Sequence, residues 1–534
     1  MFTRRLSKMV VASAAMLAAT GSAISALAEP PVYVTPTAPG VSLDSILTSG
    51  DFVGSYQVMG TPDGLGALRN GNVLTVLTNQ ELSVTNSVVA NRLTAGGKAR
   101  GSLITQLGYN VKTGKVVSAK DFLTDVVWFD YATGKYGSVG SAPAGAAPTD
   151  QYGTPNHSIL LNRFCSSTLA PAGTFYDAAS GLGYADPVYL TGEEGGDESR
   201  AFVASMDGQL VQFPKMGLAA WENLKPIPTG NKVTAVMGSE DGSAIDSQLW
   251  MYVGEKTANG KWYEKAGFTN GSTYVLATTE STPVNNDNEV RTKVGKNTPI
   301  KVRFSRVENS INGRSQNFVA NQVGIEFARI EDGHFDPMKP NDFYFVTTES
   351  NKDPKATSPN PSTPTIPRDG GALWRLRFAD VANPLKGATL TMLLDGTESP
   401  YLNKPDNITV DTAGNILIQE DPGNNAHISR IIAYRLSDGR LSVIAKFRDE
   451  LFTEGLAGFI TKDEESSGII DVTNELRKGT NDKAFYYMLV AQVHSSPTLA
   501  RPDIAAGNAF LPGSVEGGQW YVMKVSSWQS VFSQ

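Results

Sequence analysis

Short apolar runs recur along the chain, separated by polar and turn-forming residues. The runs are rich in Val, Ile, Tyr, Phe and Trp, which favour strands, and Gly, Asn, Asp and Pro lie between them. The predicted strands include Gly71–Leu77, Ser158–Phe164, Gln248–Gly254, Ser272–Thr278, Asp342–Thr348, Ala372–Phe378, Asn415–Gln419, Arg430–Leu436, Ala484–Val493 and Gln519–Val525. Amphipathic helical patterns are scarce, and the best are Ser118–Val127 and Asp471–Arg477. We therefore expect an all-β protein with a few short helices.

The length of the chain favours a propeller over other all-β folds. A single sandwich cannot use most of 534 residues of short strands, whereas about 45–80 residues per blade, insertions included, fits six or seven blades. No WD or kelch repeat is present. We predict an all-β, six-bladed-type β-propeller with inserted loops, forming one domain over residues 29–534. The Pro-rich stretch near 352–367 is predicted to be a surface insertion.

The first 28 residues have the pattern of a signal peptide. Arg4, Arg5 and Lys8 precede the apolar run Met9–Leu27, and Ala26-Leu27-Ala28 resembles a signal-peptidase site. The Arg4-Arg5 pair is compatible with the twin-arginine route, and the ordinary Sec route is the alternative. No other apolar run approaches the roughly 20 residues that span a bilayer. We expect a periplasmic or secreted protein without a membrane span.

Composition and charge exclude several classes of function. The formal net charge is −7, and removal of the signal peptide with its three cations makes it −10. Such a charge argues against nucleic-acid binding, which requires a basic surface. One Cys excludes an internal disulfide framework, and four His are too few for a site built mainly of imidazoles.

Carboxylates stand where several of the predicted strands end. They are Glu81, Glu193, Glu194, Glu349, Glu420 and Asp421. Because inner strands line the channel of a propeller, acids from different blades can meet at one mouth. Gathered carboxylates repel one another, and a hard cation such as Ca²⁺ relieves that repulsion. Each acid alone is also compatible with a solvated turn, but their recurrence at strand ends favours a metal site.

Two further features fit either a metal site or an ordinary structural role. Cys165 ends an apolar run, and a lone thiol in an exported protein risks oxidation unless it is buried or bound to metal. A thiolate among carboxylates favours a metal such as iron over Ca²⁺. Arg329 and Glu331 share one face of a predicted strand. They could grip an anion beside a metal, or form a surface ion pair with Asp332.

Familiar catalytic motifs are absent from the sequence. It contains no Gly-x-Ser-x-Gly, no phosphate loop ending in Gly-Lys-Ser/Thr, no His-Glu-x-x-His and no dinucleotide fingerprint. A mechanism based on a serine nucleophile therefore has no support in the sequence.

A series of short motifs between about residues 50 and 425 resembles one known family in its order. The motifs are Thr78-Asn79-Gln80-Glu81-Leu82, Arg163-Phe164-Cys165-Ser166, Leu190-Thr191-Gly192-Glu193-Glu194, Arg200-Ala201-Phe202, Ala220-Trp221-Glu222-Asn223, Val236-Met237-Gly238-Ser239-Glu240-Asp241, Glu264-Lys265-Ala266-Gly267, Arg329-Ile330-Glu331-Asp332 and Pro405-Asp406-Asn407-Ile408. Together they resemble the PhoX-type alkaline phosphatases, which are secreted β-propeller metallophosphatases.

The resemblance implies a cluster of Fe³⁺ and Ca²⁺ ions in the channel, held by carboxylates and one cysteine. On this analogy the cluster ligands are Cys165, Glu222, Asp241 and Glu331, with Glu81 and Glu194 as further ligands, Glu420 and Asp421 as candidates for a separate calcium site, and Glu193 as an additional candidate. Arg329 would bind the phosphate of a small monoester substrate, and a metal-bound oxo or hydroxo species would attack phosphorus. We expect a monomer.

Departures from the family leave other functions open. Gln80 stands where the family has His, Ile330 stands where it has Pro, and Pro367-Arg368-Asp369-Gly370-Gly371 lacks the Asn usual near that loop. The choice of substrate, and activity itself, are therefore in question. One alternative is a propeller that uses Ca²⁺ alone as a phosphodiesterase, a phytase-like enzyme or a lactonase. Another is a non-catalytic calcium-binding propeller.

Overall fold

The computed structural model describes residues 30–533, apart from 138–139, 147–158, 243–246, 282, 310, 350–370, 505–507 and 509–510. The predicted signal peptide at 1–28 and the Pro-rich insertion at 352–367 lie outside the described residues. No helix among the described residues is long and apolar enough to cross a membrane.

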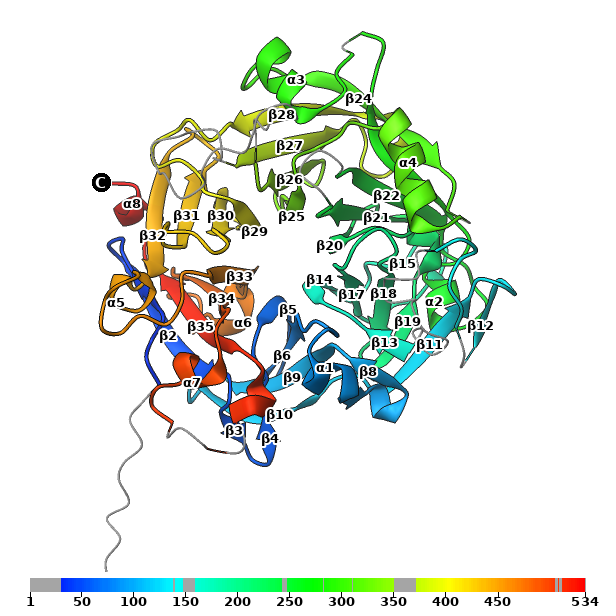
Figure 1. Ribbon diagram of the computed structural model, residues 1–534. Coiled ribbons are helices and arrows are strands. Elements are labelled where there is room, and N and C mark those ends of the chain that lie inside the picture. The colour runs from blue at the N-terminus through cyan, green and yellow to red at the C-terminus, as the bar shows by residue number, and fades with distance from the viewer. Residues whose placement is uncertain are drawn as a thin grey trace, which may run out of the picture.

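The described strands form six blades around a central channel (Figure 1). The innermost strands are β5 (Pro62–Asn70), β14 (Phe164–Ala170), β20 (Trp221–Pro226), β25 (Ile330–Phe335), β29 (Pro405–Val410) and β33 (Glu464–Asp471). Each contacts the next in this order, and β33 contacts β5, so the ring closes. The predicted six-bladed propeller is confirmed.

Blades 1 to 3 follow the chain outward from their inner strands. Blade 1 continues from β5 with β6 (Val73–Gln80), β9 (Leu103–Asn110) and β10 (Lys115–Asp121). Blade 2 continues from β14 with β17 (Val188–Glu193), β18 (Ala201–Ser205) and β19 (Gln209–Gln212), and β11 (Asp125–Asp130) and β12 (Lys135–Gly137) extend it. Blade 3 continues from β20 with β21 (Val233–Glu240), β22 (Leu249–Glu255) and β23 (Ser272–Thr278).

Blades 4 to 6 repeat this arrangement. Blade 4 adds β26 (Asp342–Thr347), β27 (Ala372–Phe378) and β28 (Ala388–Leu394) to β25, and β24 (Ile300–Val307) links β23 to β28, so blades 3 and 4 form one nine-stranded sheet. Blade 5 adds β30 (Asn415–Glu420), β31 (Arg430–Arg435) and β32 (Leu441–Phe447) to β29. Blade 6 adds β34 (Phe485–Val493) and β35 (Gly517–Val525) to β33.

Strands from the N-terminal part of the chain complete the last two blades. β1 (Val34–Pro36) pairs antiparallel with β32, and β2 (Val41–Thr48) pairs antiparallel with β35. Tyr33, directly before β1, is fully buried, and its backbone N–H lies 3.0 Å from both Gln519 Oε1 and Tyr521 Oη. The beginning and the end of the propeller are thus joined by strand pairing.

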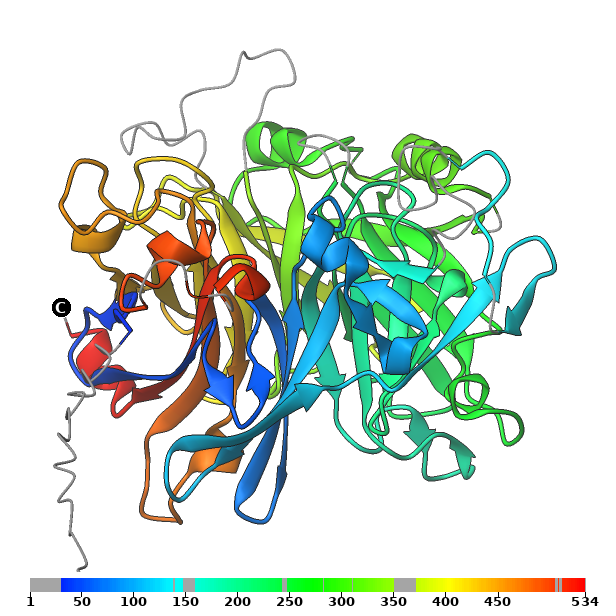
Figure 2. The ribbon, with the colours of Figure 1, turned by 60° about the horizontal axis from the view of Figure 1, so that its bottom comes forward.

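Short connections carry the remaining elements. The helices are α1 (Ser87–Asn91), α2 (Trp262–Lys265), α3 (Asp287–Glu289), α4 (Gly313–Val323), α5 (Asp449–Phe452), α6 (Thr473–Leu476), α7 (Pro497–Ala500) and α8 (Trp528–Val531). The small strands are β3 (Phe52–Val53), β4 (Tyr56–Gln57), β7 (Leu93–Thr94), β8 (Ala99–Gly101), β13 (Leu160–Leu161), β15 (Tyr176–Asp177) and β16 (Leu182–Gly183). Most of the helices lie on one side of the disc (Figure 2).

The hydrophobic core is divided among the six interfaces between blades. Along β30, Ile416 and Ile418 pack towards blade 4, whereas Leu417 packs towards blade 6. Along β34, Met488 and Leu489 likewise enter different clusters. Because both faces of a strand are buried in this way, the strands read in the sequence as continuous apolar runs rather than as alternating patterns.

Nine of the ten predicted strands coincide with β6, β22, β23, β26, β27, β30, β31, β34 and β35, and Ser158–Phe164 contains the short β13. The helix predicted at Ser118–Val127 is wrong, since this segment belongs to β10 and β11. Partly buried and exposed positions alternate along the end of β10, a period of two that the helical pattern had obscured. Within Asp471–Arg477 only Thr473–Leu476 is helical.

Candidate metal centre

The second residue of every inner strand belongs to a ring around the channel. These residues are Asp63, Cys165, Glu222, Glu331, Asp406 and Glu465. In each blade, the first residue of the inner strand pairs with the last residue of the neighbouring strand. The six blades therefore present structurally equivalent positions to the channel.

A β-bulge follows directly in five of the six blades. The register shifts immediately after the first residue of β5, β14, β20, β25 and β29, whereas in β33 it shifts later, between Ser467 and Ile469. A bulge bends its strand and redirects a side chain. In a regular strand, side chains point alternately to the two faces of the blade. The bulge interrupts this alternation, so that the second residue points into the channel instead.

A second ring is formed by the residue that follows the second strand of each blade. Its members are Glu81, Glu194, Asp241, Thr348, Asp421 and His494. In all six blades the backbone N–H of this residue donates to the carbonyl of the residue before the inner strand, over 2.9–3.0 Å. The hydrogen bond fixes the second ring beside the first.

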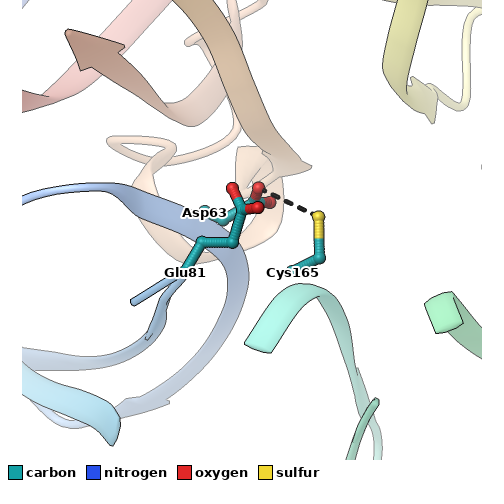
Figure 3. A group of neighbouring side chains, drawn as sticks. All are labelled: Asp63, Glu81 and Cys165. Atoms are coloured by element: carbon teal, nitrogen blue, oxygen red, sulfur yellow. Dashed lines mark hydrogen bonds between the residues drawn. The ribbon is translucent and has the colours of Figure 1, made fainter. Parts of the chain in front are cut away.

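The two rings bring metal-ligating atoms into four overlapping groups, each with its atoms within 4.8 Å of one another. The groups are Asp63–Glu81–Cys165, Cys165–Glu194–Glu222, Glu222–Glu331–Asp406 and Asp406–Asp421–Glu465. Figure 3 shows the first group, with the Cys165 thiol directed towards the two carboxylates. Because neighbouring groups share Cys165, Glu222 or Asp406, the side chains form one continuous belt of donors.

Cys165 is held in the centre of the belt by contacts with acids and with the backbone. Its Sγ lies 2.8 Å from Glu222 Oε2 and 3.4 Å from Asp63 Oδ2. Asn79 Nδ2 donates to the Cys165 carbonyl over 2.6 Å. Burial raises the pKa of the thiol well above its usual value, and Asp63 and Glu222 raise it further. Without a cation, the thiol therefore stays protonated among these carboxylates.

Burial and mutual repulsion also raise the pKa values of the carboxylates. The pKa values of Asp63, Glu222, Glu331 and Asp406 are raised well above the ordinary range. Burial, with the charge of Asp421 next in importance, raises the pKa of Glu465 to about 7.

The donor set fits metal ions. Asp406 Oδ1 is buried and has no hydrogen-bond partner, although Asp406 belongs to two of the four groups. Carboxylate oxygens suit hard cations such as Ca²⁺, and the thiol adds a ligand that suits a transition metal such as iron. Cations bound here would relieve the repulsion between the acids and would give the unpaired Asp406 oxygen a partner.

Two arginines stand at the edge of the belt. Arg329 Nε and Nη2 donate to Asp241 over 2.7 and 2.6 Å, and Nη2 lies 3.5 Å from Glu331 Oε1. Arg163 Nη2 pairs with Glu194 over 2.6 Å and also with Glu81. Both guanidinium groups thus face the ring carboxylates and remain partly exposed.

The structure brings together most of the residues predicted from the sequence. Glu81, Cys165, Glu194, Glu222, Glu331 and Asp421 all belong to the four groups. Asp241 lies in the second ring but outside these groups, where it pairs with Arg329. Burial raises the pKa of Asp241, Arg329 partly offsets this, and the resulting value is about 6.

Glu193 and Glu420 lie inside their blades. Each carboxylate forms a buried ion pair. Glu193 pairs with Arg200, directly before β18, at 2.6 Å, and Glu420 pairs with Arg430 of β31 at 2.7 Å. Burial alone would raise the pKa of Glu420, but Arg430 lowers it to about 2. Both acids are already neutralised by protein cations and lie outside the four groups.

Sequence reasoning missed Asp63, Asp406 and Glu465 as ligands. One signal for the first two was available, because both follow a proline that begins an inner strand, in Pro62-Asp63 and Pro405-Asp406. Proline is tolerated at the first residue of a strand. Glu465 offers no such signal.

Gln80 and Ile330, two of the departures from the family motifs, do not face the channel, and the third, at 367–371, lies almost entirely outside the described residues. Gln80 is fully buried, and its Nε2 donates to Thr105 within blade 1 over 3.1 Å. Ile330 is fully buried in the hydrophobic cluster between blades 3 and 4.

A polar network crosses the channel directly below the donor belt. Asn407 Nδ2 donates to Ser166 Oγ over 2.6 Å, and Asn407 Oδ1 accepts from Ser467 Oγ over 2.9 Å. On the other side, Asn223 Nδ2 donates to Asp332 Oδ1 over 2.8 Å. We call Ser166, Asn223, Asp332, Asn407 and Ser467 the channel plug. A cavity of about 290 Å³ lies further along the same strands, lined in part by Lys225, His334 and Thr409.

Comparison with known proteins agrees with this arrangement. The family model of alkaline phosphatase PhoX matches residues 207–473, which is half of the chain. The chain belongs to the PhoX alkaline phosphatase family. PhoX proteins are metal-dependent phosphatases, and the donor belt of this PhoX-family chain could bind metals.

Among solved structures, the chain is similar to Pseudomonas fluorescens PhoX in complex with vanadate, a transition state analogue, with a TM-score of 0.59 and 11% identity. That match covers 93% of this chain and 97% of the other, and supports the PhoX fold. A putative 6-phosphogluconolactonase from Bacteroides uniformis has 12% identity and covers 73% of this chain and 85% of its own, but its TM-score is only 0.30. No curated protein matches the sequence.

Proposed function

We propose that this PhoX-family protein hydrolyses phosphate monoesters, with Ca²⁺ and Fe³⁺ bound in the donor belt. The observation that carries the proposal is the continuous belt of acids around a single thiol, with Arg329 at its edge. The two groups that include the thiol, Asp63–Glu81–Cys165 and Cys165–Glu194–Glu222, suit iron. The two groups of carboxylates alone would hold Ca²⁺.

Bound cations would neutralise the belt and supply the Lewis acidity and acidified water that phosphoryl transfer requires. The side chains of this protein then have distinct tasks. The planar guanidinium of Arg329 can bind two phosphoryl oxygens at once. Because Asp241 occupies the Nε–Nη2 edge of Arg329, the phosphate would bind at the other edge of the guanidinium, formed by Nη1 and Nη2. Asp241 would hold Arg329 in that orientation.

The channel plug supports the choice of monoesters. Because the hydrogen-bonded plug crosses the channel below the belt, we expect a substrate to enter by the other mouth. A terminal phosphate can then reach the belt while its alcohol points outwards. A diester would have to place two alcohols at the same mouth.

The decisive experiment combines metal analysis with an assay on protein purified without chelators. We expect iron and several calcium ions for each chain, hydrolysis of p-nitrophenyl phosphate, and little hydrolysis of bis-p-nitrophenyl phosphate. Chelation should abolish activity, and readdition of both metals should restore it. Calcium without iron and without turnover would contradict the proposal and favour a calcium-binding propeller.

We also propose that the protein is exported, with residues 1–28 removed. Lys and Arg residues before an apolar run support this, as does the Ala26-Leu27-Ala28 sequence. Mass spectrometry of the protein from the periplasm or medium should show Glu29 as the first residue. An unprocessed chain in the cytoplasm would contradict export.

A further inference from the structure

Lys404 stands directly before inner strand β29, at the edge of the donor belt. Its carbonyl accepts the Asp421 N–H over 2.9 Å, the hydrogen bond that recurs in all six blades. The equivalent residues of the other blades are Thr61, Arg163, Ala220, Arg329 and Asp463. Lys404 therefore occupies the position on blade 5 that Arg163 and Arg329 occupy on blades 2 and 4.

The backbone supports this equivalence. Arg163, Arg329 and Lys404 have φ values of +43°, +62° and +45°, in the left-handed region that residues other than Gly rarely adopt. Each such residue costs about 1–2 kcal/mol. Thr61, the equivalent residue of blade 1, has a φ of +47° as well. The left-handed backbone therefore marks the position two places before the ligand in four blades, and in three of these blades the position carries a cation.

Lys404 differs from Arg163 and Arg329 in its ion pairing. Arg163 and Arg329 form ion pairs with carboxylates of the rings. Among the residues that the structure describes, the Lys404 ammonium makes neither an ion pair nor a side-chain hydrogen bond. It is partly buried and lies against Gly423, where an added Cβ would come 3.4 Å from Nζ. The Lys404 ammonium thus lies at the belt and is available to bind an anion.

We propose that Lys404 binds a second anionic group on the alcohol part of the substrate, while Arg329 binds the phosphoryl group. Blades 4 and 5 are adjacent, since β25 contacts β29, so the two cations can act on neighbouring parts of one molecule. The substrate class would be monoesters whose alcohol carries a carboxylate or another phosphate. A lysine suits this task, because its long stem lets one compact charge reach groups at different distances. This inference rests on the proposed phosphatase function.

The test compares two aryl phosphates that differ by one charge. Metal-loaded full-length wild type and Lys404→Met are assayed with phenyl phosphate and 4-carboxyphenyl phosphate. We expect Lys404→Met to lower kcat/KM for the carboxylated ester about tenfold and for phenyl phosphate less than twofold. Lys404→Arg should retain most of the preference. Lys112→Met, on the exposed turn after β9, is the matched control and should change neither value.

The outcomes separate the inference from the function on which it rests. An equal loss on both esters, or a change in bound metal, would overturn the inference, because Lys404 would then serve the scissile phosphate or the metals. An unchanged preference would overturn it as well. If the metal-loaded wild type hydrolyses neither ester, the proposed function itself fails. Thermal unfolding of each variant establishes that the fold is intact.

Discussion

At the scale of single residues, Cys165 sets this belt apart from an ordinary acidic channel. The thiol lies within hydrogen-bonding distance of two acids, and the pKa values of all three groups are raised. Such groups cannot all ionise unless cations are bound. The arrangement therefore has a cost for stability in the metal-free protein and a benefit for affinity in the metal-bound one.

Cys165→Ser should separate an iron site from a site that uses calcium alone. The hydroxyl keeps the shape of the side chain but is a poor ligand for iron. We expect the variant to lose its iron, to keep most of its calcium, and to lose activity by about 100-fold. Elemental analysis and the p-nitrophenyl phosphate assay measure these effects. Retention of iron and activity would mean that Cys165 is not a ligand.

The raised pKa values also predict how the stability of chelated protein depends on pH. Glu465, with a pKa of about 7, and Asp241, with a pKa of about 6, hold protons in the folded state that the unfolded chain has already released above pH 4–5. The folded state binds more protons, so the free energy of unfolding falls as pH rises. The slope is about 1.4 kcal/mol per pH unit for each such group.

We therefore expect the melting temperature of chelated protein to decrease steadily between pH 5 and 7. Metal-loaded protein should lack this decrease, because bound cations keep the carboxylates ionised. Calorimetry in the same buffers measures the melting temperatures of both forms. A chelated protein that becomes more stable over this range would contradict the assigned protonation of the belt.

At the scale of elements, close contact between inner strands keeps the channel narrow. Gly468 of β33 has a φ of +43°, and a Cβ there would come 2.4 Å from the Asp63 carbonyl of β5. Only Gly permits this approach. Strand contact at this point therefore determines where Asp63 meets the other ligands.

Gly468→Ala should displace Asp63 and weaken metal binding. Gly71→Ala is the matched control, since Gly71 has a φ of +60° but nothing lies within 4 Å of an added Cβ. The control should lose about 1–2 kcal/mol through backbone strain alone and keep its metals. Gly468→Ala should lose more stability and also calcium. Equal effects of the two substitutions would show that the contact with β5 is unimportant.

The strands could be predicted from the sequence better than the site could. Runs such as Asn415–Gln419 are apolar on both faces, because each blade is buried between two others, and this leaves a clear signal. The ring of ligands leaves only a weak signal in the sequence. Asp63 and Cys165 are 102 residues apart, whereas Cys165 and Glu222 are 57 apart. Loops of unequal length hide the sixfold repeat, so Asp63, Asp406 and Glu465 become evident as ligands only in three dimensions.

At the scale of the whole molecule, β1 and β2 hold the ring together by pairing with blades 5 and 6. Tyr33 anchors this junction, because its side chain packs in the core between these blades and its hydroxyl donates to the Ala500 carbonyl.

Tyr33→Ala should therefore destabilise the whole ring. Loss of a buried aromatic side chain costs about 3–5 kcal/mol, and we expect earlier thermal unfolding together with faster amide exchange in β1 and β32. Val32→Ala is the control, since Val32 is exposed and adjacent. If both variants unfold alike, the junction contributes little to closure.

The same pairing places a constraint on the order of events during synthesis. β1 and β2 leave the ribosome before any other described strand, yet their partners β32 and β35 are among the last to be made. A nascent chain consequently carries an open arc of blades whose ligands for metal are incomplete, because blade 6 supplies Glu465. The ring of blades therefore closes at the same stage at which the full set of ligands assembles. Both events follow the synthesis of the last blade. Metal is best acquired only then.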